Sequence, residues 1–240
     1  RLPAMGAVHY NQICLQQLSL PGAAVAARAV ASILLPQGAS EEVQRLAGSV
    51  SAASTCPVYQ LPSGLLKEFC MDVSWEEPVR YAIAWPRSKA LATMQPPFLV
   101  LDGLVSAWNL GQAVRSAVMM GVRSVILSRS AFNCLNGRAC YASLGWLYHA
   151  EYHLAEPLEE ALQQLQTLGV SIYAAEEDHP RAAAPHEPKG DARWALVVGN
   201  EEKGISRDAL ALCDQKLRVP QVRGASLNVG HATAICLYEL

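Results

Sequence analysis

The sequence predicts an α/β fold built on a mainly parallel sheet, and three observations support this fold class. Short apolar segments alternate along the chain with segments of helical periodicity. The apolar segments at 97–101 and 194–198 contain no polar residue, which is typical of strands that helices cover on both faces. Loops that combine glycine with polar residues follow such strands, and ligands bind at the carboxyl ends of strands in open parallel sheets.

The sequence predicts a small α/β domain over residues 1–90. Strands are expected at 29–35, 58–60 and 81–85, and helices from residue 41 and over 64–71. Ser40 is a candidate N-cap, because acidic side chains follow it in the first turn. Residues 91–97 are a predicted linker, since prolines bracket small and polar residues there.

The second predicted domain covers residues 98–240. Its strands are expected at 97–101, 124–127, 170–174, 194–198 and 217–220, and its helices at 109–120, 157–168, 206–212 and 228–240. In the segment 157–168 the apolar residues recur on one side, as in an amphipathic helix. The chain has 240 residues, of which 51% are hydrophobic, so it can bury a sizeable core.

Charge and cysteine content exclude several classes of protein. The formal net charge is −2, without the strongly basic balance typical of proteins that bind nucleic acid through charge alone. The chain has 7 cysteines with no C-x-x-C pair, which predicts free thiols, no zinc site and a reducing intracellular compartment, cytoplasmic or organellar. No apolar run reaches the ~18 residues of a membrane span. Because the chain starts at Arg1, a targeting segment would not be visible.

The loop after the strand at 194–198 has the sequence GNEEKG. Gly199 follows the strand directly and would permit close approach of a ligand to the backbone, and Glu201 follows two residues later. Its glycine spacing is that of a phosphate-binding P-loop, but Ile205 stands where the lysine is required, and no G-x-G-x-x-G occurs. An ordinary nucleotide-binding enzyme is therefore disfavoured, whereas a tight turn with a solvated acid stays open.

Two further segments carry candidate functional residues. Asn109 and Gly111 precede Arg115 in a helix rich in apolar residues, and a buried arginine needs a partner, either Glu201 or an anionic substrate. A solvated surface position for this arginine is the alternative. Ser226 and Asn228 precede the last helix, where they can cap it or, with the free N–H groups of the helix start, face a ligand.

Taken in order, the segments NLGQAVR, GNEEKG and SLNV resemble the three motifs of the SpoU (TrmH-like) branch of the SPOUT RNA methyltransferases. The resemblance covers residues 98–240, while residues 1–90 match only the outline of a small substrate-binding α/β domain. It implies a C-terminal trefoil knot, S-adenosylmethionine as the methyl donor, and methylation of a ribose 2′-hydroxyl in tRNA or rRNA. It also implies a homodimer. From the residues themselves, neither a metal nor a membrane is expected as partner.

The resemblance also implies roles for individual residues. The implied reaction site consists of Asn109, Arg115, Glu201, Ser226 and Asn228, and the implied cofactor contacts are Gly199, Asn200, Val219, Pro220 and Leu227. Because a guanidinium pKa lies above ~12, we expect Arg115 to grip a phosphate and stabilise the developing alkoxide rather than act as a base. Glu201 is expected to orient Arg115.

Several residues depart from the family pattern or allow other interpretations. Ser106, Ala107 and Trp108 replace the usual Asp-Pro-Gly, and Glu202 and His231 are also unusual. The alternative function is therefore a catalytically inactive member of the fold that binds RNA or protein. His149 and His153 lack the order of a zinc motif and are interpreted as structural or surface residues. The aromatic residues that could stack on RNA bases, but that favour core packing, are Trp75, Tyr81 and Trp85.

Overall fold

The computed structural model describes residues 5–10, 30–69, 79–84, 86–176, 193–221 and 227–240, with only the backbone described at 5–10, 67–69 and 79–84. The chain divides into two compact units. The first contains residues 1–86 and 136–149, and the second contains residues 87–135 and 150–240.

The first unit contains a four-stranded mixed sheet in the order β1-β4-β2-β3. Its elements are β1 (Met5–Tyr10), β2 (Val30–Pro36), α3 (Glu41–Ser54), β3 (Val58–Leu61), α4 (Ser63–Phe69), β4 (Val79–Ala84), α7 (Gly137–Ala142) and the 3-10 helix η2 (Trp146–His149). Only the pair β2–β3 is parallel. Ser40 caps α3 as predicted, because its side chain accepts the N–H of Val43. The apolar side of α3, which includes Leu46 and Val50, is buried.

The second unit contains a six-stranded sheet in the order β10-β8-β9-β5-β6-β7, and all its strand pairs are parallel. The strands are β5 (Phe98–Leu101), β6 (Ser124–Leu127), β7 (Glu151–Leu154), β8 (Ser171–Ala175), β9 (Trp194–Val198) and β10 (Gln215–Leu217). The helices are η1 (Leu91–Thr93), α5 (Ala107–Met119), α6 (Arg129–Asn133), α8 (Leu158–Thr167), α9 (Arg207–Ala211) and α10 (Val229–Glu239). The predicted mainly parallel sheet is confirmed, whereas the trefoil knot stays a prediction.

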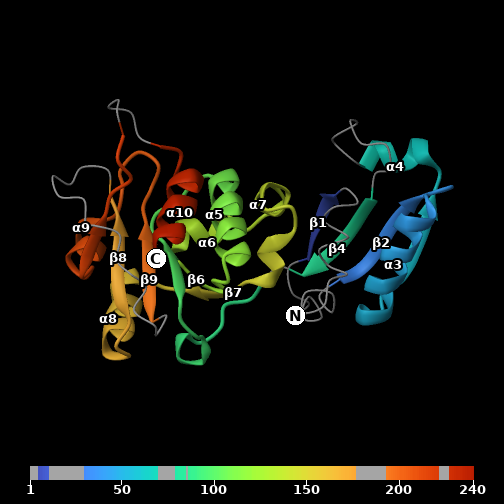
Figure 1. Cartoon of the computed structure of the whole chain (residues 1–240). Helices are drawn as coiled ribbons and strands as arrows, with labels where there is room; N and C mark the ends of the chain where they lie inside the picture. Colours follow the sequence, from blue (N-terminus) through green and yellow to red (C-terminus); the bar gives the residue numbers. More distant parts are fainter. Residues whose placement is uncertain (1–4, 11–29, 70–78, 85, 177–192, 222–226) are drawn as a thin grey trace. The chain divides into compact units, whose positions relative to one another are not determined.

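Helices cover both faces of this sheet (Figure 1). Because successive residues of a strand point to opposite faces, Phe98 and Val100 of β5 join a core with Leu162 and Leu165 of α8. Helices α5 and α10 lie side by side, and they contact β5 and β9 respectively. All four residues of β5 are buried, which explains why its sequence contains no polar residue.

Among the boundaries that differ from the sequence-based expectations, three concern the second unit. The compact division falls after Pro86, and Leu91 and Met94 are buried in the core of the second unit rather than forming a free linker. Helix α5 begins at Ala107 rather than at residue 109, because Ser106 caps it. Strand β10 ends at Leu217, so the predicted strand over 217–220 was placed too late.

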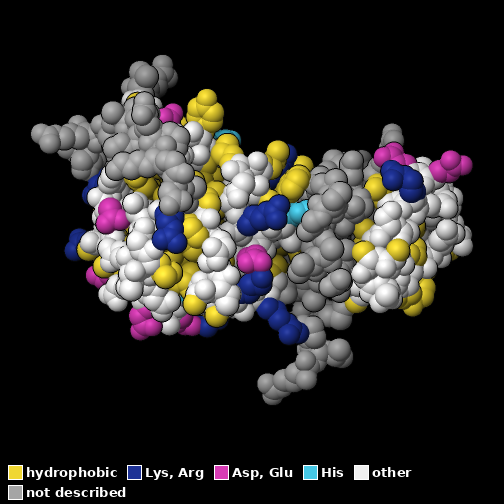
Figure 2. All heavy atoms as spheres, turned by 60° about the horizontal axis from the view of Figure 1, so that its bottom comes forward, with side chains coloured by type: hydrophobic (Ala, Val, Ile, Leu, Met, Phe, Trp, Pro, Cys, Tyr) yellow, Lys and Arg dark blue, Asp and Glu magenta, His cyan; other side chains and the backbone are white. Residues whose placement is uncertain are grey.

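The described residues were also compared with the expectations for membrane spans, cysteines and surface charge. Among them, no helix is long and apolar enough to cross a membrane. None of the described cysteines forms a disulfide, and these are Cys56, Cys134, Cys140, Cys213 and Cys236. Cys14 and Cys70 lie outside the described residues. On the face drawn in Figure 2, the described Lys and Arg side chains lie in small groups among residues of other kinds rather than in one continuous basic surface.

Candidate functional site

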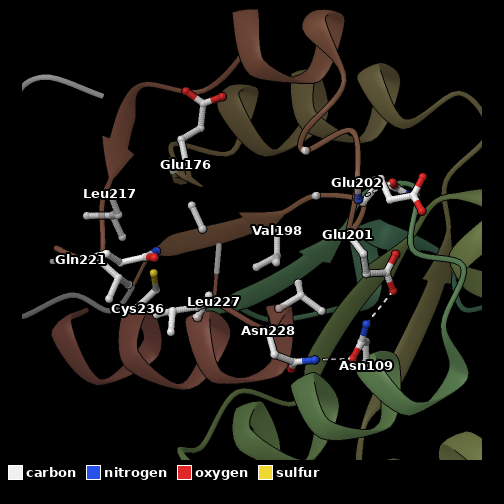
Figure 3. Close-up of a pocket in the computed structure, with 17 residues that line it drawn as sticks. Asn109, Glu176, Val198, Glu201, Glu202, Leu217, Gln221, Leu227, Asn228 and Cys236 are labelled. Carbon is white, nitrogen blue, oxygen red and sulfur yellow. Dashed lines mark hydrogen bonds between the residues drawn. The ribbon is translucent and has the colours of Figure 1, made fainter. Parts of the chain in front are cut away.

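A cavity of about 330 Å³ opens at the carboxyl ends of β8, β9 and β10, beside the start of α10 (Figure 3). Its volume lies at the lower end of the range of about 300–1,000 Å³ typical of small-molecule sites. The residues that line it are Asn109, Ala175, Glu176, Val198, Gly199, Asn200, Glu201, Glu202, Gly204, Leu217, Val219, Gln221, Leu227, Asn228, Val229, Ala232 and Cys236. The cavity therefore lies where the strand topology predicts a ligand site.

The loop after β9 forms one wall of the cavity by folding back on itself. Asn200 and Gly204 exchange backbone hydrogen bonds at 2.9 and 3.0 Å. A Cβ atom at Gly199 would lie 2.2 Å from the backbone of both Gly204 and Ile205. The glycine is thus required by the chain's own backbone, and not only by the close approach of a ligand that the sequence suggested. Asn200 fastens the loop to its surroundings, because its Nδ2 donates to the carbonyl oxygen of Gly103 at 2.7 Å.

Three predicted site residues from distant segments meet at this wall. Glu201 Oε1 accepts a hydrogen bond from Asn109 Nδ2 at 2.9 Å, and Asn109 Oδ1 accepts one from Asn228 Nδ2 at 2.9 Å. Figure 3 shows this chain of hydrogen bonds between the β9 loop, α5 and the start of α10. The Glu201 carboxylate also accepts the backbone N–H groups of Val105 and Ser106, at 3.4 and 3.2 Å. These hydrogen bonds therefore attach Glu201 to the N-terminal end of α5.

Asn228 has a second role as the N-cap of α10. Its Oδ1 accepts the N–H of Gly230 at 2.9 Å, while its Nδ2 remains available for Asn109. A Cβ at Gly230 would lie 2.7 Å from Gln112 Oε1, so this glycine lets α10 approach α5 closely. The capping interpretation and the functional interpretation of Asn228 are thus compatible, because its two side-chain atoms serve different partners.

Arg115 lies apart from this group. It does not line the cavity, and its guanidinium forms no hydrogen bond or ion pair with the described part of the chain. The expected pairing of Glu201 with Arg115 is therefore wrong within a single chain, because the Glu201 carboxylate is bound by Asn109 and by the backbone just before α5. The partly buried Arg115 shares one side of α5 with the exposed side chains of Trp108 and Met119, since residues 7 and 4 positions away recur on one helix face.

The predicted cofactor contacts divide in a similar way. Gly199, Asn200, Val219 and Leu227 line the cavity, whereas Pro220 is exposed and does not. Ser226, a predicted reaction-site residue, lies outside the described residues.

The cavity also contains residues that the sequence did not single out. Glu176 follows β8 directly, and Gln221 and Cys236 contribute further polar atoms. Burial raises the pKa of the Cys236 thiol to about 11, with a smaller contribution from the charge of Glu239. This thiol is therefore protonated near neutral pH and is a poor nucleophile. The position of Glu176 after a strand was the only sequence signal that could have found it.

The remaining candidates have other surroundings. His153 Nδ1 lies 2.7 Å from the carbonyl oxygen of Lys89, and the ring of His149 packs against Trp146 with centroids 4.8 Å apart. Among the described residues, no group of His, Cys, Asp and Glu could hold a metal ion. Trp108 is 48% exposed and does not line the cavity.

The aromatic residues proposed to stack on RNA bases lie mostly outside the residues that the structure describes. Trp75 and Trp85 lie outside the described residues, and Tyr81 is described only by its backbone in β4.

Comparison with known proteins connects this geometry to a family. The sequence model of the SpoU rRNA Methylase family matches residues 96–238. The chain belongs to this family. The match covers all three motif segments and nearly the whole second unit, as the resemblance read from the sequence led us to expect.

Relatives with curated names match about three fifths of the chain. The 23S rRNA (guanosine-2′-O-)-methyltransferase RlmB of Photorhabdus laumondii is 35% identical over 153 residues, which are 62% of this chain and 61% of the relative. The Escherichia coli K12 protein of the same name is 33% identical over 153 residues, with the same coverage. The chain thus spans about three fifths of the length of these relatives.

Solved structures resemble the chain over both units. The rRNA methyltransferase of Sinorhizobium meliloti has a TM-score of 0.76 at 19% identity and covers 97% of this chain and 86% of its own. The SpoU methyltransferase AviRb of Streptomyces viridochromogenes, in complex with the cofactor AdoMet, has a TM-score of 0.74 at 18% identity and covers 98% of this chain and 89% of its own. At these identities the likeness establishes the fold.

Proposed function

We propose that this protein transfers a methyl group from S-adenosylmethionine to a ribose 2′-hydroxyl of ribosomal RNA. The observation that carries the proposal is the hydrogen-bonded chain Glu201–Asn109–Asn228 at the wall of the cavity. Membership of the SpoU family and the names of the 33–35% identical relatives support the reaction and the rRNA substrate. Those relatives act on guanosine, which makes guanosine the first nucleotide to test.

The cavity fits S-adenosylmethionine in both polarity and charge. Val198, Leu217 and Leu227 provide apolar walls suited to a purine ring. Three carboxylates line the cavity, and its described lining contains no Lys or Arg, so the surroundings favour a cationic ligand over an anionic one. When bound, S-adenosylmethionine supplies an electrophilic methyl group on a positively charged sulfonium. The backbone after β9 and the side chains of Val219 and Leu227 would hold the cofactor.

The side chains at the cavity edge have distinct tasks in this reaction. Asn228 is exposed, so its amide can contact the incoming ribose while its Oδ1 caps α10. Asn109 fixes the orientation of that amide, and Glu201 fixes Asn109. Glu201 is thus a positioning residue that acts through Asn109. Such pre-arranged contacts align the hydroxyl with the methyl group and supply part of the rate enhancement.

Arg115 would act in the reaction only within a homodimer. The exposed apolar side chains of the second unit lie mainly on and beside α5 and α10, and include Trp108 (48% exposed), Met119 (61%), Ile235 (40%) and Tyr238 (81%). Large apolar side chains gathered on two adjacent helices are typical of a protein interface. A dimer formed through this face would carry Arg115 toward the partner's RNA, where its guanidinium grips a phosphate and stabilises the developing alkoxide.

The experiment that tests the proposal maps 2′-O-methylation across total RNA from cells with and without this protein. The proposal predicts one rRNA position that loses its methyl group and regains it when purified protein and S-adenosylmethionine are added to unmethylated RNA. An unchanged methylation map, together with no transfer to deproteinised rRNA in vitro, would reject it.

The alternative function is a catalytically inactive member of the fold that binds RNA or protein. The specific observation that favours it is Trp108, a bulky exposed residue one position before Asn109. Calorimetry separates the two functions, because an inactive member is expected to show no heat of binding with S-adenosylmethionine at millimolar concentration.

A further inference from the structure

Among the described residues that line the cavity, Glu176 is the one charged residue that no motif includes. It follows the last residue of β8, and its backbone N–H donates to the carbonyl oxygen of Leu217 in β10 at 2.9 Å. This bond fixes the residue between the carboxyl ends of two strands. Figure 3 shows Glu176 at one end of the cavity and Asn109 at the other. Its side chain is 22% exposed, and the residue lines the cavity.

The charge of Glu176 is already matched by a neighbour. Its Oε2 lies 2.8 Å from Lys216 Nζ, and the Lys216 side chain is 35% exposed. A carboxylate that is paired in this way gains little from a second cation. It retains lone pairs on both oxygens, however, and these can accept hydrogen bonds from neutral hydroxyl groups.

The position of Glu176 relative to the β9 loop suggests which hydroxyls it binds. In dinucleotide-binding sheets, an acidic residue near a glycine-containing strand–loop junction binds the ribose hydroxyls of the nucleotide. Here β8 pairs with β9, and Gly199 follows β9. The apolar side chains of Val198 and Leu217 line the same cavity and would contact the base.

From this arrangement we infer that the Glu176 carboxylate binds the vicinal 2′- and 3′-hydroxyls of the cofactor's adenosyl ribose and selects adenosyl cofactors that carry them. The inference rests on the proposed function, because it assumes an adenosyl cofactor in this cavity. It assigns a specificity-determining role to a residue outside all three motifs.

Calorimetry with two ligands tests the assignment. The probes are S-adenosylhomocysteine and its 2′,3′-dideoxy analogue, measured against the unaltered chain and against Glu176→Ala. The unaltered chain is expected to bind the natural ligand about 10- to 100-fold more tightly, as for hydrogen bonds to a charged group. Glu176→Ala is expected to bind both ligands with nearly equal, weak affinity. A general structural disturbance would weaken both ligands alike and keep their ratio.

Two further variants keep the outcome decisive. Glu176→Gln has the same shape and replaces Glu176→Ala if the alanine variant does not fold; it is expected to lose most of the discrimination. Glu160→Ala removes an exposed carboxylate of α8 that does not line the cavity, and is expected to keep the full ratio. A Glu176 variant that retains the ratio of the unaltered chain overturns the ribose assignment alone. If the unaltered chain binds neither S-adenosylmethionine nor S-adenosylhomocysteine, the proposed function itself fails.

Discussion

The cavity wall and the outer side of α5 use neighbouring residues of one motif in different ways. Asn109 and Arg115 are six residues apart, so an ideal helix places them about 9 Å apart along its axis and about 120° apart around it. Asn109 joins Glu201 and Asn228 through hydrogen bonds inside the chain. Arg115 instead lies among exposed apolar side chains and makes no polar contact in the described part of the chain.

This contrast teaches that one sequence motif can serve two surfaces. Residues that face the cavity hold the loops together, so their replacement should lower both stability and activity. Arg115 contributes no described hydrogen bond to the folded chain, so its replacement should affect methyl transfer alone. Substitutions of residues on the two surfaces test whether effects on stability and on methyl transfer separate in this way.

Replacing Arg115 should give the largest effect on the reaction and almost none on folding. We expect Arg115→Ala to slow single-turnover methyl transfer about 100- to 1,000-fold, the loss typical when a charged stabilising group is removed. Arg115→Lys should recover only a small part, because an ammonium cannot form the bidentate contact of a guanidinium. The melting temperature should change by less than about 2 °C, as for a surface substitution.

The control for this prediction is Arg123→Ala, which removes an exposed arginine beyond the end of α5. It should keep the transfer rate within about twofold, since exposed charges far from the reaction contribute little. Near-normal single-turnover chemistry by Arg115→Lys with RNA bound would mean that the guanidinium fork is not needed, and the assigned role would be lost.

Replacing Gly199 should give the largest effect on stability. A Cβ would lie 2.2 Å from the Gly204 carbonyl carbon and from the Ile205 nitrogen, so the loop after β9 must move. We expect Gly199→Ala to lower the free energy of unfolding by about 3 kcal/mol, the upper part of the usual range for overpacking. Urea denaturation measures this loss, and calorimetry should show weaker cofactor binding.

Gly48→Ala provides the matched control in helix α3. Its Cβ would meet no atom within 4 Å, and alanine favours helix, so stability should rise by up to about 1 kcal/mol. If Gly199→Ala is as stable as the unaltered chain, the loop has room that the structure does not provide, and the proposed reason for this glycine is wrong.

The fold was predictable from the sequence in its central strands and not at its edges. Strands β5, β6 and β9 were placed within one residue at each end, because nearly all their residues are buried and burial on both faces requires mainly apolar segments. Strand β8 was placed equally closely, although its residues alternate between buried and more exposed positions. The edge strands β7 and β10 have no such pattern. In β7 only Tyr152 is buried, so the polar residues on either side concealed the strand. In β10 all three residues are partly exposed, and the apolar Val219 drew the prediction beyond the true end.

The site was predictable in part for a similar reason. Asn109, Glu201 and Asn228 each follow or begin an element that meets the carboxyl edge of the sheet, so topology brings them together. The six-residue spacing predicts that Arg115 lies about 120° around the helix from Asn109, but it does not reveal that the cavity lies on the side of Asn109 alone. Glu176 was not singled out, because its position after a strand was its only signal and no glycine motif accompanies it.

Replacing Glu201 should have a smaller effect on stability than replacing Gly199. Glu201→Ala removes the acceptor for the Asn109 side chain and for two backbone N–H groups at the entrance of α5. Hydrogen bonds to a charged group contribute more than neutral ones, so we expect a loss of about 2 kcal/mol in the free energy of unfolding. Urea denaturation measures it.

Glu202→Ala is the control for this loss, because Glu202 is exposed on the same loop. Its free energy of unfolding should stay within about 0.5 kcal/mol of the unaltered chain. Equal stability of Glu201→Ala and Glu202→Ala would show that the Glu201 hydrogen bonds do not stabilise the start of α5. The proposed difference between the cavity wall and the outer side of α5 would then be wrong.

Replacing Asn228 should lower stability less than replacing Gly199 or Glu201, and it separates the two contacts of this residue. Asn228→Ala removes the N-cap of α10 and should cost about 1 kcal/mol. Asn228→Asp keeps an oxygen that accepts the N–H of Gly230, and its negative charge suits a helix start, so stability should return to within about 0.5 kcal/mol of the unaltered chain.

The aspartate of Asn228→Asp cannot donate to Asn109 Oδ1, however, because a carboxylate is only an acceptor. Methyl transfer by Asn228→Asp should therefore stay about tenfold slow, the value of one lost hydrogen bond. Full activity in this stable variant would mean that the amide donor is dispensable and that Asn228 serves only as a cap.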